Sequence, residues 1–237
     1  MSKLTDGQTI TSYAIFRIGL KARLYDIDTN VFEKLPIIKE KNGTLIKYLP
    51  VSRTTVYAVP DGIIKILKNT FIPNISDRID ERYYNPLEVI RIPESVEVIK
   101  PSAFGCCIFL ESIEVDEGNR FFKSVDGVLF SKDGKKLLAF PAGRMEENYI
   151  VPEGVEVIGE NAFQNSCVYK ITMASTIKQI KNNAFWFSYT NIVDFSKARI
   201  EKFGNGIFAD AINMTVITGS NSFCADFENV KFEQFED

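Results

Sequence analysis

The residue types that most often perform catalysis or bind metals are sparse in this sequence. It contains no histidine, which excludes histidine-dependent nucleophiles, histidine metal sites and the usual general base near neutral pH. The cysteines lack the repeated C-x-x-C spacing of a zinc site, and they are too few for a disulfide framework in a chain of this length. We therefore expect no metal, no cofactor and only free thiols at the cysteine positions, which are Cys106, Cys107, Cys167 and Cys224.

Carboxylates are the remaining candidates for acid–base chemistry. Glu111, Glu114 and Asp116 lie close together and make a carboxylate-dependent hydrolase a remote alternative. Their spacing, however, follows the sequence repeat described below and indicates no separate catalytic pair. We therefore expect that the protein is not an enzyme.

Two short motifs resemble ligand-binding loops but lack essential residues. The run Asp26–Asn30 begins like an EF-hand calcium loop, yet Val31 and Ile37 stand where that loop requires Gly and a bidentate Glu. Gly204 and Gly206 lack the third glycine of a dinucleotide-binding loop. Both motifs are better explained as parts of the repeat.

Length, composition and charge are those of an ordinary globular protein. The net charge of −3 over 237 residues provides no basic field for phosphates, so we expect no nucleic-acid partner. No stretch approaches the roughly 18 apolar residues of a membrane-spanning helix, and we expect no membrane insertion. Met1–Ile15 has neither the apolar core nor the cleavage site of a signal peptide, which predicts a cytoplasmic chain unless an export signal was removed.

Self-comparison reveals an internal repeat that ends in phenylalanine. Ile92–Phe104 (IPESVEVIKPSAF) and Val151–Phe163 (VPEGVEVIGENAF) are two copies of one unit. Further copies are Val59–Phe71 and Met173–Phe185, and weaker ones end at Phe32 and Phe208. The final Phe recurs after 22 residues from Phe163 to Phe185 and after 23 residues to Phe208. This period is typical of leucine-rich repeats, and it predicts one interior Phe per coil.

Short apolar runs precede most of these units and predict strands, which would position the turns and the corner residues of each unit. Leu87, Ile90 and Ile92 alternate as expected for a half-buried strand, and the same spacing recurs at Leu110, Val168 and Thr190. Because a single unit cannot bury its own apolar face, the units must stack.

The combined pattern L-x-x-I-x-I-P-x-x-V-x-x-I-x-x-x-A-F resembles the BspA-like leucine-rich-repeat family over about residues 15–218. The resemblance implies an α/β but β-rich repeat: a curved solenoid of short strands and tight or 3-10 turns with inserted β-hairpins. We expect one domain over residues 1–237, with degenerate repeats at 10–71, well-formed repeats at 87–208 and a C-terminal cap at 209–237. Turns at Asn42-Gly43 and Asp133-Gly134 predict the hairpins.

The same resemblance implies recognition or adhesion at a cell surface. We therefore expect a non-catalytic module that binds a protein partner as a monomer or weak dimer, and an intracellular scaffold or specificity subunit is the alternative. Trp186 and Phe187 are candidate contacts because they align with small or polar residues of other units, although both rings could instead cover a neighbouring coil. A second candidate surface is the set of outward strand positions, which are Ala58, Arg91, Glu114, Ile150, Thr172 and Asp194.

Overall fold

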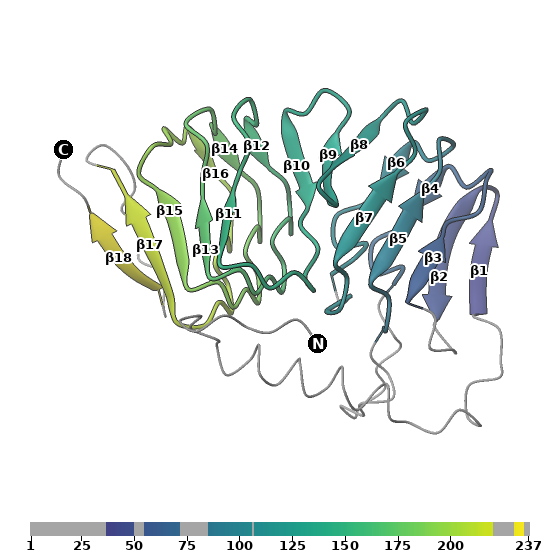
Figure 1. Cartoon of the computed structure of the whole chain (residues 1–237), viewed down its shortest axis with the longest axis horizontal. Helices are drawn as coiled ribbons and strands as arrows, with labels where there is room; N and C mark the ends of the chain where they lie inside the picture. The colour runs from purple at the N-terminus through teal and green to yellow at the C-terminus, as the bar shows by residue number, and fades with distance from the viewer. Residues whose placement is uncertain (1–36, 50–54, 72–84, 106, 220–229, 235–237) are drawn as a thin grey trace, which may run out of the picture.

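A computed structural model describes residues 37–49, 55–71, 85–105, 107–219 and 230–234, which form strands joined by turns (Figure 1). The β-rich solenoid is confirmed, but the α part of the expected α/β repeat is not found, because the described residues contain no helix. The calcium-like run Asp26–Asn30, the repeats expected before residue 37, and Cys106 and Cys224 lie outside the described residues.

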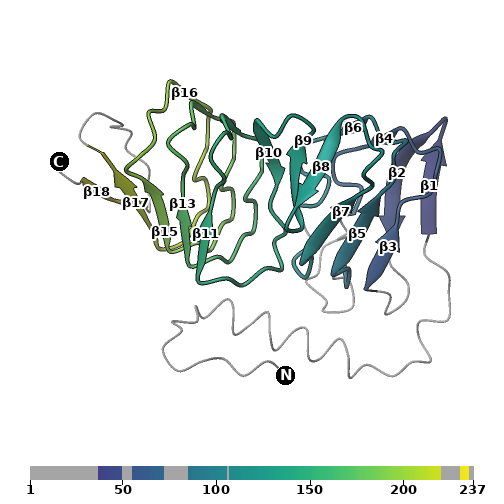
Figure 2. The same cartoon turned by 45° about the horizontal axis from the view of Figure 1, so that its top comes forward.

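The coils place their strands in two rows, which we call the first face and the second face. Figure 2 shows both rows running along the solenoid, with β8, β9 and β10 between the two groups of first-face strands. The first face contains β3 (Val56–Ala58), β5 (Val89–Ile92), β7 (Ser112–Val115), β11 (Asn148–Ile150), β13 (Lys170–Thr172), β15 (Ile192–Phe195), β17 (Met214–Thr218) and β18 (Val230–Gln234). The second face contains β1 (Ile37–Lys41), β2 (Thr44–Leu49), β4 (Lys65–Ile66), β6 (Val98–Ile99), β8 (Phe122–Val125), β9 (Val128–Ser131), β10 (Lys136–Ala139), β12 (Val157–Ile158), β14 (Gln179–Ile180) and β16 (Lys202–Phe203).

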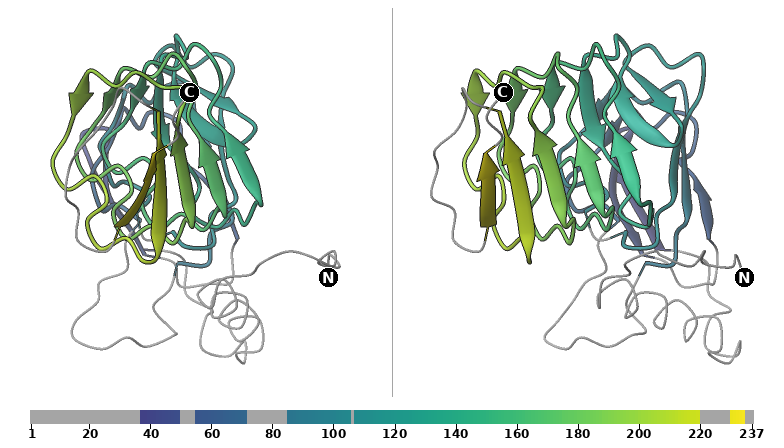
Figure 3. Two further views of the ribbon diagram at one scale, coloured as in Figure 1. Left: turned by 90° about the vertical axis from the view of Figure 1, so that its left-hand side faces the viewer. Right: turned by 60° about the vertical axis from the view of Figure 1, so that its left-hand side comes forward.

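Corner phenylalanines form the interior column that the repeat predicts. Phe163 and Phe185 stack with ring centroids 5.1 Å apart, and Phe185 lies 5.3 Å from Phe208. Backbone hydrogen bonds run alongside the rings, since Phe163 N donates to Ala184 O at 2.7 Å. The stacked coils in Figure 3 therefore share one continuous apolar interior over this part of the chain.

The long interval between Phe104 and Phe163 contains a further corner that was not predicted. Phe140 occupies it: its ring lies 5.4 Å from that of Phe163, and its N–H donates to Ala162 O at 2.7 Å. On the other side, Phe104 stacks with Phe71 at 5.6 Å. The column is thus made of two stacks, Phe71 with Phe104 and Phe140 through Phe208.

The inserted segment lies between these two stacks as an antiparallel meander of β8, β9 and β10. The predicted turn at Asp133-Gly134 joins β9 to β10, and a second turn at Asp126-Gly127, which was not predicted, joins β8 to β9. Val128, Leu129 and Phe130 of β9 are all buried. Because neighbouring side chains on a strand point to opposite sides, Leu129 packs into the N-terminal core cluster and the other two pack into the C-terminal one. We call this junction of the two core clusters the seam.

The hairpin at the start of the described chain also matches its prediction. β1 and β2 pair antiparallel around Asn42 and Gly43, which have φ of 50° and 67°. Positive φ at both central residues is the requirement of a type I′ hairpin turn, and Asn-Gly meets it with little strain.

Candidate interaction surface

The outward strand positions lie in register on the first face. Ala58 pairs with Arg91 and then with Glu114 across β3, β5 and β7. Ile150 pairs with Thr172 and then with Asp194 across β11, β13 and β15. Since β7 and β11 belong to different sheets, these residues form two separate rows on either side of the seam.

The two rows differ in how much of their chemistry is available to a partner. Arg91 and Glu114 form an exposed ion pair at 2.8 Å, and such pairs contribute little to stability. Asp194 is less available to a partner, because it is more buried and has more hydrogen bonds. Its carboxylate accepts hydrogen bonds from Ser196 N at 3.0 Å and from Lys170 Nζ at 2.9 Å, and its side chain is 13% exposed. Burial raises the pKa of Asp194, but these hydrogen bonds outweigh it and lower the pKa overall. Ile150, at 69% exposure, is the most exposed large apolar side chain of the described chain.

Trp186 and Phe187 form a contacting aromatic pair at the corner of their coil. Their ring centroids lie 5.0 Å apart with the planes at 66°, an edge-to-face arrangement. Trp186 is half-buried, and its Nε1 donates to Asp210 Oδ2 on the next coil at 2.8 Å, whereas Phe187 remains 39% exposed. The Trp186 ring is thus held against the neighbouring coil, and Phe187 is the member of the pair that faces solvent.

The backbone of Phe187 is unusual for a bulky residue. Its φ is 52°, in the left-handed region, and the equivalent positions of the adjacent coils are Asn165 (φ 58°) and Asp210 (φ 55°). Asn and Asp tolerate this conformation because their short side chains can hydrogen-bond locally, while a large side chain crowds the following carbonyl. The coil corner therefore requires the left-handed turn but does not require an aromatic ring.

Two further residues belong to this surface and were not identified from the sequence. Asp210 is the hydrogen-bond acceptor of Trp186, and Ile212 is 49% exposed, with its N–H donating to Ser188 O at 3.3 Å. Asp210 could have been found, because it lies 23 residues after Phe187, one repeat along the chain. No sequence signal marks Ile212. We call the surface made of Trp186, Phe187, Asp210 and Ile212 the aromatic edge.

The left-handed turn gives a direct stability test. Phe187→Asn is expected to be more stable than Phe187→Ala by about 1 kcal/mol, because Asn adopts positive φ at lower cost than Ala. Urea unfolding followed by circular dichroism measures both variants. Equal stabilities, or a more stable alanine variant, would show that the backbone strain at this corner is small.

The three clustered carboxylates do not assemble into a shared site. Glu114 forms an ion pair with Arg91, Asp116 Oδ1 accepts a hydrogen bond from Gly118 N at 2.8 Å, and Glu111 is exposed immediately before β7. Within the described ranges, no group of three or more Cys, Asp or Glu side chains is arranged to hold a metal ion. Those ranges also contain no helix with the length and apolar character needed to cross a bilayer.

Cys107 and Cys167 are buried thiols outside any disulfide. Asn85 Nδ2 donates to Cys107 Sγ at 3.7 Å, and Cys167 Sγ donates to Asn165 O at 3.8 Å. For these two positions the free thiols predicted from the sequence are found, and both are buried.

Parallel coils of about 22 residues, paired strand rows and a column of corner phenylalanines define a leucine-rich-repeat solenoid. The sequence matches the family model described as the BspA type leucine rich repeat region, in six copies over residues 59–133 and 139–236. The chain therefore belongs to the BspA-type leucine-rich-repeat family. No curated protein gave a significant match.

Solved structures agree with this assignment at the level of the fold. A leucine-rich repeat protein from Eubacterium ventriosum is 20% identical with a TM-score of 0.58, and the match covers 72% of this chain and 44% of that one. The pneumococcal vaccine antigen PcpA is 19% identical with a TM-score of 0.53, and the match covers 79% of this chain and 58% of that one. The chain thus spans about half the length of these relatives.

Proposed function

We propose that this protein is a non-catalytic protein-interaction module and that the aromatic edge contacts its partner. The observation that carries the proposal is Phe187, an exposed ring held in a left-handed conformation that the adjacent coils fill with Asn165 and Asp210. Strained residues cluster at binding sites, and aromatic side chains dominate the binding energy of many interfaces. A rigid solenoid corner also holds these rings in place before binding, which lowers the entropic cost of association.

The chemistry of the aromatic edge favours a partner that presents a basic side chain. The Asp210 carboxylate lies next to the Trp186 ring, and the Phe187 ring is partly exposed beside it. An arginine can hydrogen-bond to the carboxylate while its guanidinium packs on an aromatic face. Ile212 is a further exposed apolar side chain, and its backbone N–H donates to Ser188 O, one residue after Phe187.

The test uses a variant that copies the preceding coil. Trp186→Gln combined with Phe187→Asn reproduces Gln164 and Asn165, so the corner keeps residues that this solenoid already accommodates. Proteins captured by the wild type from bacterial and host extracts are identified by mass spectrometry, and the affinity of each purified partner is then measured. We expect the double variant to bind about 30-fold more weakly, with an unchanged circular dichroism spectrum.

Ile150→Thr is the matched control on the first face, because it reproduces Thr172, its neighbour in register. It should leave the affinity unchanged. If the double variant binds every partner as tightly as the wild type does, the proposal is overturned. If only Ile150→Thr loses affinity, the interaction surface lies at the outward strand positions instead.

Two related alternatives share this fold. An adhesin-like role at the cell surface and a role as an intracellular scaffold or specificity subunit differ in location, and fractionation of cells that express the native gene product separates them. A carboxylate-dependent hydrolase that uses Glu111, Glu114 and Asp116 is a remote alternative, and it would show turnover in a broad hydrolase screen.

We also propose that residues 1–237 form one solenoid domain, with residues 209–237 as its C-terminal cap. We propose that the protein is a monomer or a weak dimer, and light scattering would distinguish these two states.

A further inference from the structure

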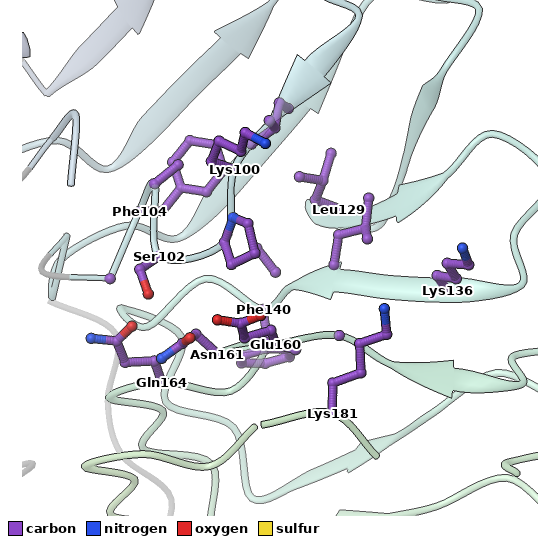
Figure 4. A pocket seen from close by; sticks show the side chains of 18 of the residues that line it. Lys100, Ser102, Phe104, Leu129, Lys136, Phe140, Glu160, Asn161, Gln164 and Lys181 are labelled. Atoms are coloured by element: carbon purple, nitrogen blue, oxygen red, sulfur yellow. The ribbon is translucent and has the colours of Figure 1, made fainter. Parts of the chain in front are cut away.

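A pocket lies at the seam, between the corner that holds Phe104 and the corner that holds Phe140. It has a volume of about 140 Å³ and is partly open to solvent, and Figure 4 shows side chains that line it. Its apolar wall is formed by the two phenylalanines together with Leu129 and Leu138 of the meander. We call it the seam pocket.

The pocket exists because the inserted meander interrupts the stacking of coils. The second-face sheet that contains β6 ends there, and the next sheet begins with β8, β9 and β10. Elsewhere one corner closes directly on the next, as where Phe140 N and Phe163 N donate to the following coil. Phe104 instead stacks with Phe71 and leaves its other side toward the pocket.

One end of the seam pocket carries a hydrogen-bond acceptor without a partner. Gln164 is 5% exposed, and its Oε1 accepts no hydrogen bond from the described part of the chain. Gly105 leaves room for this amide, since a Cβ at that position would lie 2.5 Å from Oε1. A buried carbonyl that has lost its water and gained no donor is unfavourable, so a ligand that supplies an N–H or O–H would gain from meeting it.

The other end of the pocket is cationic. Figure 4 shows the side chains of Lys136 and Lys181 together on the side opposite Gln164. Lys100 also lines the pocket, and Glu160 is the acidic side chain among its lining residues. None of the three lysines has an ion-pair partner within the described ranges. This end therefore favours an anion.

We propose that the seam pocket binds an N-acylated apolar amino acid, either as a free molecule or as the C-terminal residue of a peptide. The apolar side chain would lie between Phe104 and Phe140, and the amide N–H would donate to Gln164 Oε1. The carboxylate, which is on the same carbon as the N–H, would be attracted toward Lys136 and Lys181 at the far end. The volume suits the apolar side chain of such a ligand, because a cavity of about 150 Å³ accommodates a benzene ring. The site is separate from the aromatic edge and does not depend on the function proposed for it.

Three probes that differ by one group each test these contacts. N-acetyl-phenylalanine carries all three features, its C-terminal amide lacks the carboxylate, and 3-phenylpropionate lacks the N–H. Titrations followed by NMR of the full chain should give a Kd of about 1 mM for the first, a modest affinity suited to a ligand of this size. The other two should bind at least about 10-fold more weakly, because each lacks one polar contact.

Protein variants locate the binding. Gln164→Leu keeps the size of the side chain but removes the acceptor, and it should weaken N-acetyl-phenylalanine without changing 3-phenylpropionate. Lys136→Met combined with Lys181→Met should weaken both acids, whereas Lys197→Met, an exposed lysine outside the pocket, should change neither. Because all three lysines of this set are exposed, these variants are expected to fold.

A peptide that ends in phenylalanine distinguishes the two ligand sources. Tighter binding than N-acetyl-phenylalanine indicates a chain end, and weaker binding indicates a free acid. The proposal is overturned if N-acetyl-phenylalanine causes no shift, or if it binds Gln164→Leu as well as the wild type. Variants of the aromatic edge should bind the acid normally, so failure of one proposal leaves the other open.

Discussion

Replacement of Phe185 by alanine is expected to destabilise the protein by about 4 kcal/mol. The ring is fully buried and contacts a phenylalanine on each side, Phe163 at 5.1 Å and Phe208 at 5.3 Å. Its removal takes apolar surface out of the core and leaves a cavity that stacked coils cannot easily close, because each coil is fixed by backbone hydrogen bonds to the next. Urea unfolding followed by circular dichroism measures the loss.

Phe104→Ala is the matched control for this prediction. Phe104 stacks on one ring, Phe71, and borders the seam pocket on its other side, so its replacement removes fewer contacts. We expect its cost to be about 1 kcal/mol smaller than that of Phe185→Ala. An equal or larger cost for Phe104 would contradict the view that stacking on both sides is what makes the column stable.

Gly143→Ala should also be strongly destabilising, by about 3 kcal/mol, through a different mechanism. Gly143 follows the Phe140 corner, and its N–H donates to Leu110 O at 2.6 Å, which joins the coils on the two sides of the seam. A Cβ at this position would lie 2.3 Å from Phe109 C and 2.4 Å from Phe109 O. These are backbone atoms that cannot rotate away, so the two coils would have to separate.

If the two coils separated at Gly143, the contacts of the neighbouring Arg144 would also be lost. Its guanidinium pairs with Asp126 at 2.9 Å and with Glu146, and it lies 5.4 Å from the Phe140 ring centroid. It therefore ties the β8–β9 turn to the chain that leads into β11. A shift at Gly143 would disturb this group together with the backbone hydrogen bond.

Gly154→Ala provides the comparison for Gly143→Ala. Gly154 has φ of 93°, but a Cβ there would meet no atom within 4 Å. Its replacement should therefore cost only the backbone strain, about 1 kcal/mol. Thermal or urea unfolding of both variants separates strain from steric overlap, and similar losses would mean that the seam yields without much cost.

The features that follow a repeated pattern could be predicted from the sequence. The copies ending at Phe163, Phe185 and Phe208 share one period, and a constant period places each Phe at the same corner of successive coils. The turn at Asn42-Gly43 was predictable for a local reason, since both residues tolerate positive φ. Alternation of apolar residues also assigned Ile150 and Thr172 correctly to outward strand positions.

The features that depend on contacts between distant residues could not be predicted in this way. Phe140 is an exception, because Ala139-Phe140 carries the Ala-Phe ending of the repeat 23 residues before Phe163, and a search at that spacing would have separated it from the exposed Phe121. The α component expected from the family resemblance is not found in the described chain, where turns close the coils. The alignment of repeats identified Trp186 and Phe187 as unusual residues, but we did not predict from it the left-handed backbone conformation of Phe187.

The sequence by itself determined the period, the interior phenylalanine of the regularly spaced coils and the family, because these depend on residues that recur at constant spacing. Only the tertiary structure decided where the stacking of coils breaks, how the meander with Val128 and Leu129 fills that break, and that the Gln164 carbonyl is left without a donor beside it. The physical reason is that period and turn preference are local properties of the chain. A seam, in contrast, arises where two surfaces from distant segments meet and must accommodate each other's shape.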